Sequence, residues 1–281
     1  DKVDAKGILS GKPSYTGDFV PKDALIIKVL RSPHAQAKIK SIDTSKAKLI
    51  PGVEAIFTYE DVPNTRFTLA GQTYPEPSAY DALILDSVVR YVGDEVALVV
   101  AKDEATALKA MPLIKVEYEV QKPVLDLRTA MDHETVVHPE DDILNHIPVG
   151  QDYKRNICVS YHKRVGDIEG ELAKCDYVVE GTYFDQATRQ SAMEPFQSFG
   201  YIDHLGRIVI VSSTQIVFHV RRHIARALGI PASKIRVIKP RIGGGFGSKQ
   251  TACTELMTAF VTWKLQKPCY LLYDRTEAQT C

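Results

Sequence analysis

Cysteine is scarce in this sequence, and its spacing excludes several classes of site. The chain has 281 residues and five cysteines, none of them in a Cys-x-x-Cys pair: Cys158, Cys175, Cys253, Cys269 and Cys281. An odd and widely spaced set is typical of reduced thiols in a cytoplasmic protein rather than of a disulfide framework. The same spacing provides no iron–sulfur or structural zinc signature within this chain.

Long apolar runs and an excess of charge are also missing. No uninterrupted apolar run is long enough to span a bilayer, and residues 1–6 are polar, unlike the apolar core of a signal peptide. Lys and Arg together number 35, as do Asp and Glu, so the formal net charge is zero rather than the basic excess of a nucleic-acid binder. We therefore expect a cytoplasmic protein that binds neither membranes nor nucleic acids.

The sequence does have enough apolar material for a sizeable core. Hydrophobic residues make up 44% and charged residues 25% of the chain, and this length predicts one large or two ordinary domains. Strands are predicted at residues 24–30 and 53–57. A helix at residues 103–111, capped by Asp103, lies between predicted strands at residues 95–100 and 113–118. That order predicts a crossover unit, in which the two strands would be parallel.

The pattern fades between residues 121 and 153, where prolines and an acidic run predict a connector, although a long surface excursion of one domain is the alternative. It returns in the second half of the chain. Helices are predicted at residues 167–174, 216–228 and 252–265, with Gly229 as the glycine that ends the second of them. Arg221, Arg222 and Arg226 on that helix are interpreted as a solvated basic face. Strands are predicted at residues 156–163, 176–184, 197–203, 208–213, 235–239 and 270–273.

A glycine-rich loop lies between the strand at 235–239 and the helix at 252–265. Its sequence is Gly243-Gly244-Gly245-Phe246-Gly247-Ser248-Lys249-Gln250. Four glycines in five residues let the backbone approach a ligand closely and turn its N–H groups inward. A helix that follows such a loop presents its positive end to the same place. Anionic oxygens are therefore the expected guests of this loop.

Two nucleotide-binding interpretations of the loop fail on position. A Walker loop needs glycine where Ser248 stands, and it needs a hydroxyl residue after its lysine, where this chain has Gln250. A dinucleotide fingerprint also needs a glycine at position 248. A plain turn without a ligand remains an alternative, since glycine clusters mark turns. Phe246 disfavours that alternative, because an aromatic ring is poor turn chemistry but could wall a cofactor cavity.

Further motifs surround the loop. In the second half these are Ser212-Ser213-Thr214-Gln215, Arg221-Arg222 and residues 227–231 and 235–240, together with Met193-Glu194-Pro195. With residues 243–250 they resemble the molybdenum hydroxylases, the xanthine oxidase family, and most of all the molybdenum-binding subunits of bacterial xanthine dehydrogenases. In the first half, residues 31–35, 51–53, 61–63, 91–94 and 115–119 resemble the α/β hammerhead domain of that family.

The resemblance implies an α+β fold of two parts. Residues 1–122 would form the N-terminal α/β hammerhead domain, residues 123–152 a linker, and residues 153–281 the first part of a molybdopterin-binding domain. It also implies that the family's catalytic base, a glutamate far downstream, lies beyond Cys281. This chain would then hold no catalytic residue and would not turn over alone. Glu194 is interpreted as a buried or interface carboxylate, and Lys249 as structural or anion-facing.

The resemblance also assigns cofactor contacts. Gln215 would hydrogen-bond an oxygen ligand of the molybdenum, the backbone of Phe246 and Gly247 would lie beside the metal, and Gly244 and Gly245 would give access to the dithiolene side of the pterin. Gln215 as a helix cap is the alternative for that residue. Gln250 would contact the substrate where animal-type enzymes carry a glutamate, or it would be an ordinary residue of the helix's first turn.

The implied reaction is hydroxylation of a purine, xanthine or hypoxanthine, with water as the oxygen source. Aldehydes or another N-heteroaromatic are alternative substrates, and a non-catalytic fragment or assembly module is an alternative of another class. The implied cofactor is molybdenum–molybdopterin, with the cytosine dinucleotide form open. The 2Fe–2S clusters, FAD and NAD would lie on partner iron–sulfur and FAD subunits or segments, and the remaining C-terminal molybdopterin-binding region would complete the site around a small heteroaromatic substrate.

Overall fold

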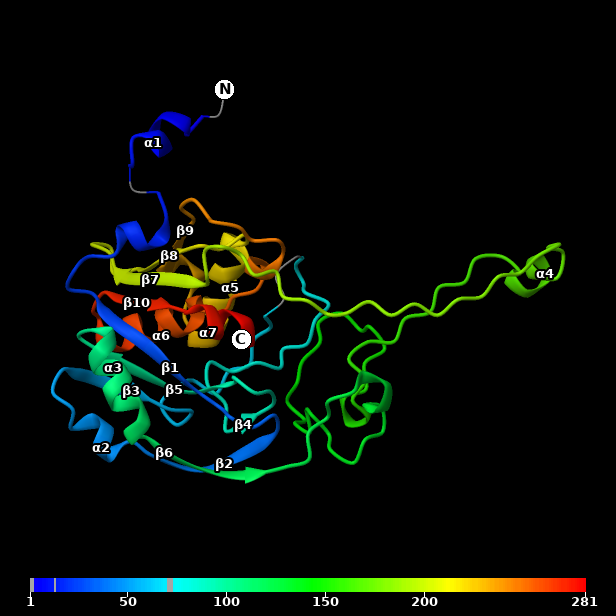
Figure 1. Cartoon of the computed structure of the whole chain (residues 1–281), viewed down its shortest axis with the longest axis horizontal. Coiled ribbons are helices and arrows are strands. Elements are labelled where there is room, and N and C mark those ends of the chain that lie inside the picture. Colours follow the sequence, from blue (N-terminus) through cyan, green and yellow to red (C-terminus); the bar gives the residue numbers. More distant parts are fainter. Residues whose placement is uncertain (1–2, 13, 70–72) are drawn as a thin grey trace.

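A seven-stranded mixed sheet runs through both halves of the chain (Figure 1). The computed structural model describes residues 3–12, 14–69 and 73–281. Along the sheet the strands are β3 (Val53–Phe57), β5 (Glu95–Ala101), β1 (Leu25–Arg31), β10 (Cys269–Leu272), β7 (Gln197–Ile202), β8 (Ile208–Ser212) and β9 (Ile235–Ile238). Strands β1 and β10 pair in parallel, with Leu25 opposite Cys269. This pair joins the first part of the chain to its last strand, and the proposed division into two domains stays a prediction.

The second half of the sheet agrees closely with its predicted elements. Strands β7 and β8 form the predicted antiparallel hairpin, and the parallel pair β8–β9 is connected by helix α5 (Val217–Leu228). Gly229 ends α5 in the left-handed conformation, with φ 65°. Helix α7 (Arg275–Thr280), which follows β10, was not expected from the sequence. It begins with a capping box between Asp274 and Glu277.

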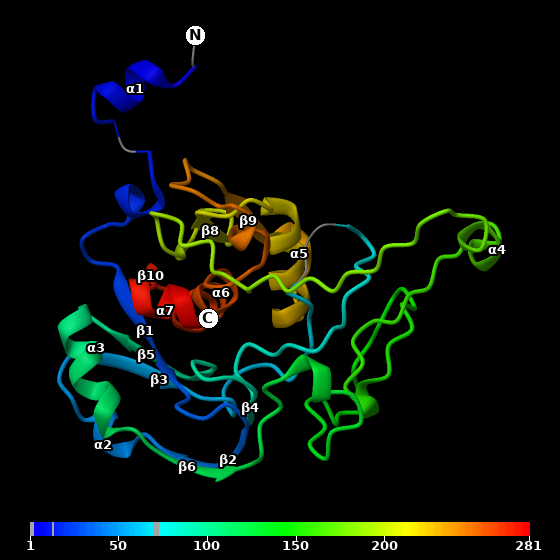
Figure 2. The same ribbon diagram turned by 45° about the vertical axis from the view of Figure 1, so that its right-hand side comes forward.

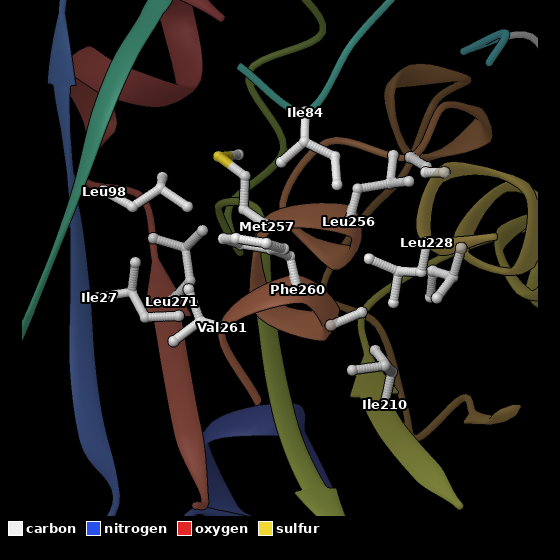
Figure 3. Close-up of a cluster of buried hydrophobic side chains, with 14 of the residues drawn as sticks. Ile27, Ile84, Leu98, Ile210, Leu228, Leu256, Met257, Phe260, Val261 and Leu271 are labelled. Carbon is white, nitrogen blue, oxygen red and sulfur yellow. The ribbon is translucent and has the colours of Figure 1, made fainter. Parts of the chain in front are cut away.

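Helix α6 (Glu255–Leu265) fills the main hydrophobic core (Figure 3). Its side chains Leu256, Met257, Phe260 and Val261 are all buried, so the helix is apolar nearly all round, as expected for a helix covered on every side. It packs between the sheet, represented by Ile27, Leu98, Ile210 and Leu271, and Leu228 of α5. Helices α2 (Ser45–Lys48) and α3 (Glu104–Ala110) pack on the other face, against Ile56, Val99 and Ala101.

The crossover expected in the first half is wrong. Asp103 caps α3 as predicted, accepting a hydrogen bond from the backbone N–H of Thr106. However, the strand after α3, β6 (Lys115–Val120), does not join the sheet of β5 but pairs antiparallel with β2 (Ala37–Asp43) in a three-stranded sheet with β4 (Val88–Val89). Strand β5 is buried along most of its length while β6 alternates and stays half-exposed. A strand with one wet face suits a small antiparallel sheet.

The predicted strands at residues 156–163 and 176–184 are also wrong. Residues 158–190, called the arm from here on, extend away from the body on both sides of α4 (Ile168–Leu172), with α4 at the tip (Figures 1 and 2). Asp167 caps α4 as predicted, accepting from the N–H of Gly170. A β-strand exists only where a neighbour supplies a hydrogen-bond ladder. The first segment has only an isolated bridge between Asp152 and Ile157 and one hydrogen bond from the N–H of Ser160 to the carbonyl of Val149, and the second has no backbone hydrogen bond in the described part of the chain.

The connector before the arm has little regular structure. Residues 121–153 contain only the short 3-10 turn Leu127–Thr129 and the start of another, Tyr153–Arg155. At the other end of the chain, helix α1 (Ala5–Leu9) precedes a 3-10 turn at Thr16–Phe19. No helix in the described part of the chain combines the length and the apolar character needed to cross a bilayer.

The basic face of α5 is not solvated, contrary to its interpretation from the sequence. Arg222 donates to the buried carboxylate of Glu76 at 2.6 Å, and Tyr80 donates to the other oxygen of that carboxylate at 2.8 Å. Arg226 donates to the carbonyl of Arg66 and lies over the Tyr80 ring. Arginines placed at this spacing fasten the segment around Glu76 onto α5. Sequence periodicity cannot reveal such long-range partners.

His223 lies inside this cluster and predicts a pH dependence. Its side chain is 4% exposed, with Nε2 3.7 Å from Glu76, and burial lowers its pKa to about 4. In the unfolded chain the pKa is about 6.5, so the unfolded state takes up the proton first as the pH falls. As the pH falls through the range between these two pKa values, the neutral, buried His223 therefore lowers the free energy of unfolding by about 3 kcal/mol. Urea unfolding at pH 7 and pH 4 measures this loss.

Replacing His223 tests the assignment. His223→Leu removes the titrating group and should flatten the pH dependence of the free energy of unfolding. His204→Leu, in the exposed hairpin turn between β7 and β8, is the matched control and should leave that dependence unchanged. An unchanged pH profile in His223→Leu contradicts the role given to this residue.

Candidate functional site

The glycine loop adopts a conformation that few side chains allow. Gly244 and Gly247 have φ angles of 100° and 90°, and Phe246 has a φ of 49°, the left-handed region that is costly for a bulky residue. The N–H of Ser248 donates to the carbonyl of Gly245 at 2.8 Å, which closes the turn. The Phe246 side chain is 75% exposed. Strain of this kind together with an exposed aromatic ring is typical of a ligand-binding loop rather than a plain turn.

Gln215 is brought directly onto the loop. Its backbone N–H donates to the carbonyl of Lys249 at 2.8 Å. A Cβ atom on Gly245 would lie 2.6 Å from Oε1 of Gln215, so a larger residue at position 245 would displace the Gln215 amide. The Oε1 atom is buried and has no hydrogen-bond partner in the described part of the chain. Helix α5 has no side-chain cap, which removes the alternative of Gln215 as a capping residue.

The carboxylate of Glu194 is bonded to both ends of the glycine loop. Its Oε2 accepts from the ammonium of Lys249 at 2.8 Å and from the N–H of Gly243 at 2.7 Å, while its Oε1 accepts from the amide of Gln197 at 2.7 Å. The Glu194 side chain is 10% exposed and the Lys249 side chain 2%. The expected buried carboxylate is therefore confirmed, and Lys249 is its structural partner rather than an anion-facing residue.

Arg275 in α7 fixes the segment before Glu194, a role that the sequence did not indicate. Its guanidinium donates to the carbonyls of Ala192 and Met193 at 2.8 and 2.9 Å. Ala192 in turn lies beside Gly244, since a Cβ atom there would meet Ala192 Cβ at 3.3 Å and the Phe246 ring at 3.0 Å. Met193 is 90% exposed. The open side of the loop is thus flanked by two exposed apolar side chains, Met193 and Phe246.

The helix that follows the loop begins later than expected. The loop passes into a 3-10 turn at Ser248–Gln250, and α6 starts at Glu255 rather than at residue 252. Glu255 is buried at that end and accepts a hydrogen bond from the Ser212 hydroxyl at 2.5 Å, and burial raises the pKa of its carboxyl. A carboxylate of the protein itself thus faces the positive end of α6. The loop's own N–H groups and the Gln215 amide are left as the polar groups for a ligand.

The geometry restricts what the site can hold. Behind the loop is a cavity of only about 20 Å³, beside Glu194, Lys249 and Arg275, which has room for a single water molecule. A larger ligand must therefore lie on the open side, next to Phe246. No group of three or more His, Cys, Asp or Glu residues among the described residues could hold a metal ion.

Gln250 is the last residue of the glycine-rich loop. It ends the 3-10 turn, and its N–H donates to the carbonyl of Gly247 at 3.1 Å. The side chain is half-buried. Its expected contact with a substrate is not tested by this geometry and stays a prediction.

The Glu194–Lys249 pair yields a prediction about stability. Glu194→Ala leaves a buried ammonium without a partner and should lower the free energy of unfolding by about 3–5 kcal/mol. The double variant Glu194→Ala/Lys249→Met removes both charges and should recover a large part of that loss. Chemical denaturation of the purified protein measures both values. A double variant that is less stable than Glu194→Ala would contradict the pair's role.

Comparisons with known proteins agree on where this chain belongs. Residues 10–122 match the family described as aldehyde oxidase and xanthine dehydrogenase, a/b hammerhead domain, and residues 149–281 match the molybdopterin cofactor-binding domain. The probable hypoxanthine oxidase XdhD of Escherichia coli (strain K12) is 39% identical over 98% of this chain and 31% of its own length. The putative xanthine dehydrogenase molybdenum-binding subunit XdhA of the same strain is 36% identical over 94% of this chain and 34% of its own.

A solved structure extends the likeness to the fold. Quinoline 2-oxidoreductase from Pseudomonas putida 86 superposes with a TM-score of 0.80 at 28% identity, over 98% of this chain and 34% of the other. The chain spans about a third of the length of the two curated relatives named above. The matched hammerhead and molybdopterin-binding descriptions confirm the family and the α+β fold class expected from the sequence.

Proposed function

Because this chain belongs to the molybdenum hydroxylase family of aldehyde oxidases and xanthine dehydrogenases, we propose that it forms part of the cofactor-binding region of an enzyme that hydroxylates a purine. Xanthine or hypoxanthine is the proposed substrate and water the oxygen source. Two relatives support this choice by their names, a probable hypoxanthine oxidase and a putative xanthine dehydrogenase subunit. The rest of the enzyme would lie in other parts of a longer polypeptide and in partner subunits.

The observation that carries the proposal is the buried amide of Gln215 against Gly245. Its Oε1 position has no hydrogen-bond partner in the described part of the chain, and an unsatisfied buried amide is costly unless a ligand completes it. The Oε1 atom can only accept, so it would take a hydrogen bond from an N–H or O–H of the bound ligand, while the NH₂ group of the same amide would donate to an oxygen ligand of the metal. Gln215 would thus orient the molybdenum through one of the metal's oxygen ligands.

The loop would supply the remaining contacts to the molybdenum–pterin cofactor. Gly244 and Gly245 let the backbone approach the pterin side closely, and the backbone of Phe246 and Gly247 would lie beside the metal. The cofactor, when bound, supplies the oxidation of the substrate and the activation of water. The described residues hold and orient it. The base that accepts the substrate's proton would come from elsewhere in the enzyme, so this chain alone would be inactive.

Gln250 would contact the substrate. A neutral amide can donate to and accept from the ring nitrogens and carbonyl oxygens of a purine, but it cannot exchange a proton as a carboxylate would. That neutrality also favours a second candidate, another N-heteroaromatic, and the structural likeness to a quinoline 2-oxidoreductase points to the same class. We propose further that 2Fe–2S, FAD and NAD lie on partner subunits, that the pterin takes either its simple or its cytosine dinucleotide form, and that the enzyme is cytoplasmic.

The cofactor assignment predicts the behaviour of a Gln215 variant. In the full-length enzyme purified with its partners, Gln215→Ala should lower kcat by about 10²–10³ through loss of one aligned hydrogen bond. The melting temperature should fall little, because the Oε1 atom of this side chain has no hydrogen-bond partner to lose in the described part of the chain. Gln215→Asn keeps the amide one methylene shorter and should retain more activity than the alanine variant. Parallel loss of turnover and stability would contradict the assignment, as would a native enzyme without molybdenum.

The substrate assignment predicts a selective effect at position 250. A panel of hypoxanthine, xanthine, nicotinate and an aliphatic aldehyde should give the highest kcat/KM for a purine. Gln250→Ala should lower kcat/KM for purines by about tenfold to a hundredfold, the worth of one or two hydrogen bonds to the ring. Turnover of the aldehyde, which has no ring nitrogen to bind, should change less. An equal fall for every substrate would reject the contact.

A further inference from the structure

Two cysteine side chains meet where α6 begins and α7 ends. Cys253 lies just before α6, and Cys281 ends α7 and packs on the same hydrophobic core as α6 (Figures 1 and 2). Both side chains line one cavity, and their thiols share a hydrogen bond. The proposed cofactor contacts use neither of them.

The cavity gives small solutes access to both thiols. It has a volume of about 310 Å³, which is room for several molecules of the size of hydrogen peroxide. Its wall is mostly apolar and includes Phe67 and Ile84 from the first half of the chain and Met257 from α6. Cys253 and Cys281 are both half-buried, so a small molecule in the cavity can reach either sulfur.

The two thiols differ in how readily they lose the proton. The Cys253 thiol donates a hydrogen bond to the sulfur of Cys281, which lowers the pKa of Cys281. The same bond raises the pKa of Cys253, and burial raises it further. The thiolate is the nucleophilic form of cysteine. Cys281 is therefore the better nucleophile, and Cys253 is the thiol that keeps its proton.

Positive charge near Cys281 favours the same order. After the hydrogen bond from Cys253, the guanidinium groups of Arg31 and Arg189 lower the pKa of Cys281 further, whereas burial and Glu95 oppose them. The Arg31 side chain is 12% exposed, and its Nε and Nη2 atoms have no hydrogen-bond partner in the described part of the chain. A buried cation with unused donors stabilises an anion that forms nearby.

We propose that Cys281 and Cys253 are a modification site for hydroperoxides, at which Cys281 is the attacking thiolate and Cys253 the resolving thiol. The Cys281 sulfur attacks one peroxide oxygen, the O–O bond breaks, and the other oxygen leaves as water or an alcohol. Cys281 is then a sulfenic acid. The Cys253 sulfur attacks the Cys281 sulfur, the S–S bond forms, and the S–O bond breaks to release a second water that carries the Cys253 proton. The two thiols are oxidised to one disulfide, and the peroxide takes up the two electrons.

A disulfide at this place would join the two segments that hold the glycine loop. On one side, Arg275 of α7 holds the segment before Glu194. On the other, the Thr251 hydroxyl lies 3.4 Å from the Cys253 sulfur and donates to the carbonyl of Ser248 at 3.3 Å. Oxidation of the pair therefore cross-links the supports of the loop, and a dithiol reductant releases them.

Mass spectrometry of the full-length enzyme tests the pair. Hydrogen peroxide is added until the exposed Cys175 is oxidised, free thiols are blocked with iodoacetamide, and the protein is digested with trypsin without reduction. The peptide of residues 250–264 should be linked to the peptide that begins at Thr276, with a mass two hydrogen atoms below their sum. Dithiothreitol should separate the two peptides. Alkylated Cys253 and Cys281 at a peroxide dose that oxidises Cys175 would overturn the inference.

Serine variants of the full-length enzyme test the order of the two steps. In Cys253→Ser the sulfenic acid on Cys281 has no resolving thiol, so dimedone should trap it there. In Cys281→Ser, dimedone labelling of Cys253 should be about tenfold slower or more, because burial disfavours its thiolate. Cys175→Ser is the matched control and should leave the disulfide unchanged. Equal labelling of the two single thiols would contradict the order, and if a variant does not fold, the linked peptide of the native enzyme still decides the pair.

Discussion

The buried ion pair between Glu194 and Lys249 is the interaction on which the site depends. One carboxylate receives the ammonium from the far end of the glycine loop, the N–H of Gly243 from its beginning, and the amide of Gln197 from the start of β7. The loop is therefore attached at both ends to the central sheet. That attachment lets Phe246 hold a strained backbone and keeps Gly245 pressed against Gln215. A loop positioned this way is organised before any ligand arrives, which reduces the entropic cost of binding.

The sequence predicted those parts of the fold in which local pattern and final contacts agree. The hairpin β7–β8, helix α5 with its terminal Gly229 and the cap of α3 by Asp103 all follow from nearby residues. Prediction from the sequence failed where the structure of a segment depends on a partner far away along the chain. Strand β6 pairs with β2 rather than with the sheet of β5, and the arginines of α5 find Glu76 and the carbonyl of Arg66 instead of solvent. In the arm, residues with the composition of a strand have no hydrogen-bond ladder in the described part of the chain, so the strands predicted there are absent.

The sequence proposed the members of the candidate site but not the contacts that hold them in place. Family resemblance singled out Gln215, Gly244, Gly245, Phe246 and Gly247, and the structure brings the amide of Gln215 onto Gly245. The close packing of the Gln215 amide on Gly245, the unpartnered Oε1 atom and the hydrogen bonds from Arg275 depend on three-dimensional packing. The late start of α6 at Glu255, with a buried carboxylate at its end, also could not be read from glycine spacing. It leaves the loop, rather than the end of the helix, as the proposed place for a ligand.

The central claim is that the open side of this loop holds molybdenum beside Gln215. Crystals of the full-length enzyme, measured on both sides of the molybdenum absorption edge, test it most directly. The account predicts one anomalous peak on the Phe246 side of the loop, with an oxygen ligand of the metal within hydrogen-bond distance of the Gln215 amide. A molybdenum peak remote from Gln215, or no peak in a catalytically active crystal, would contradict it.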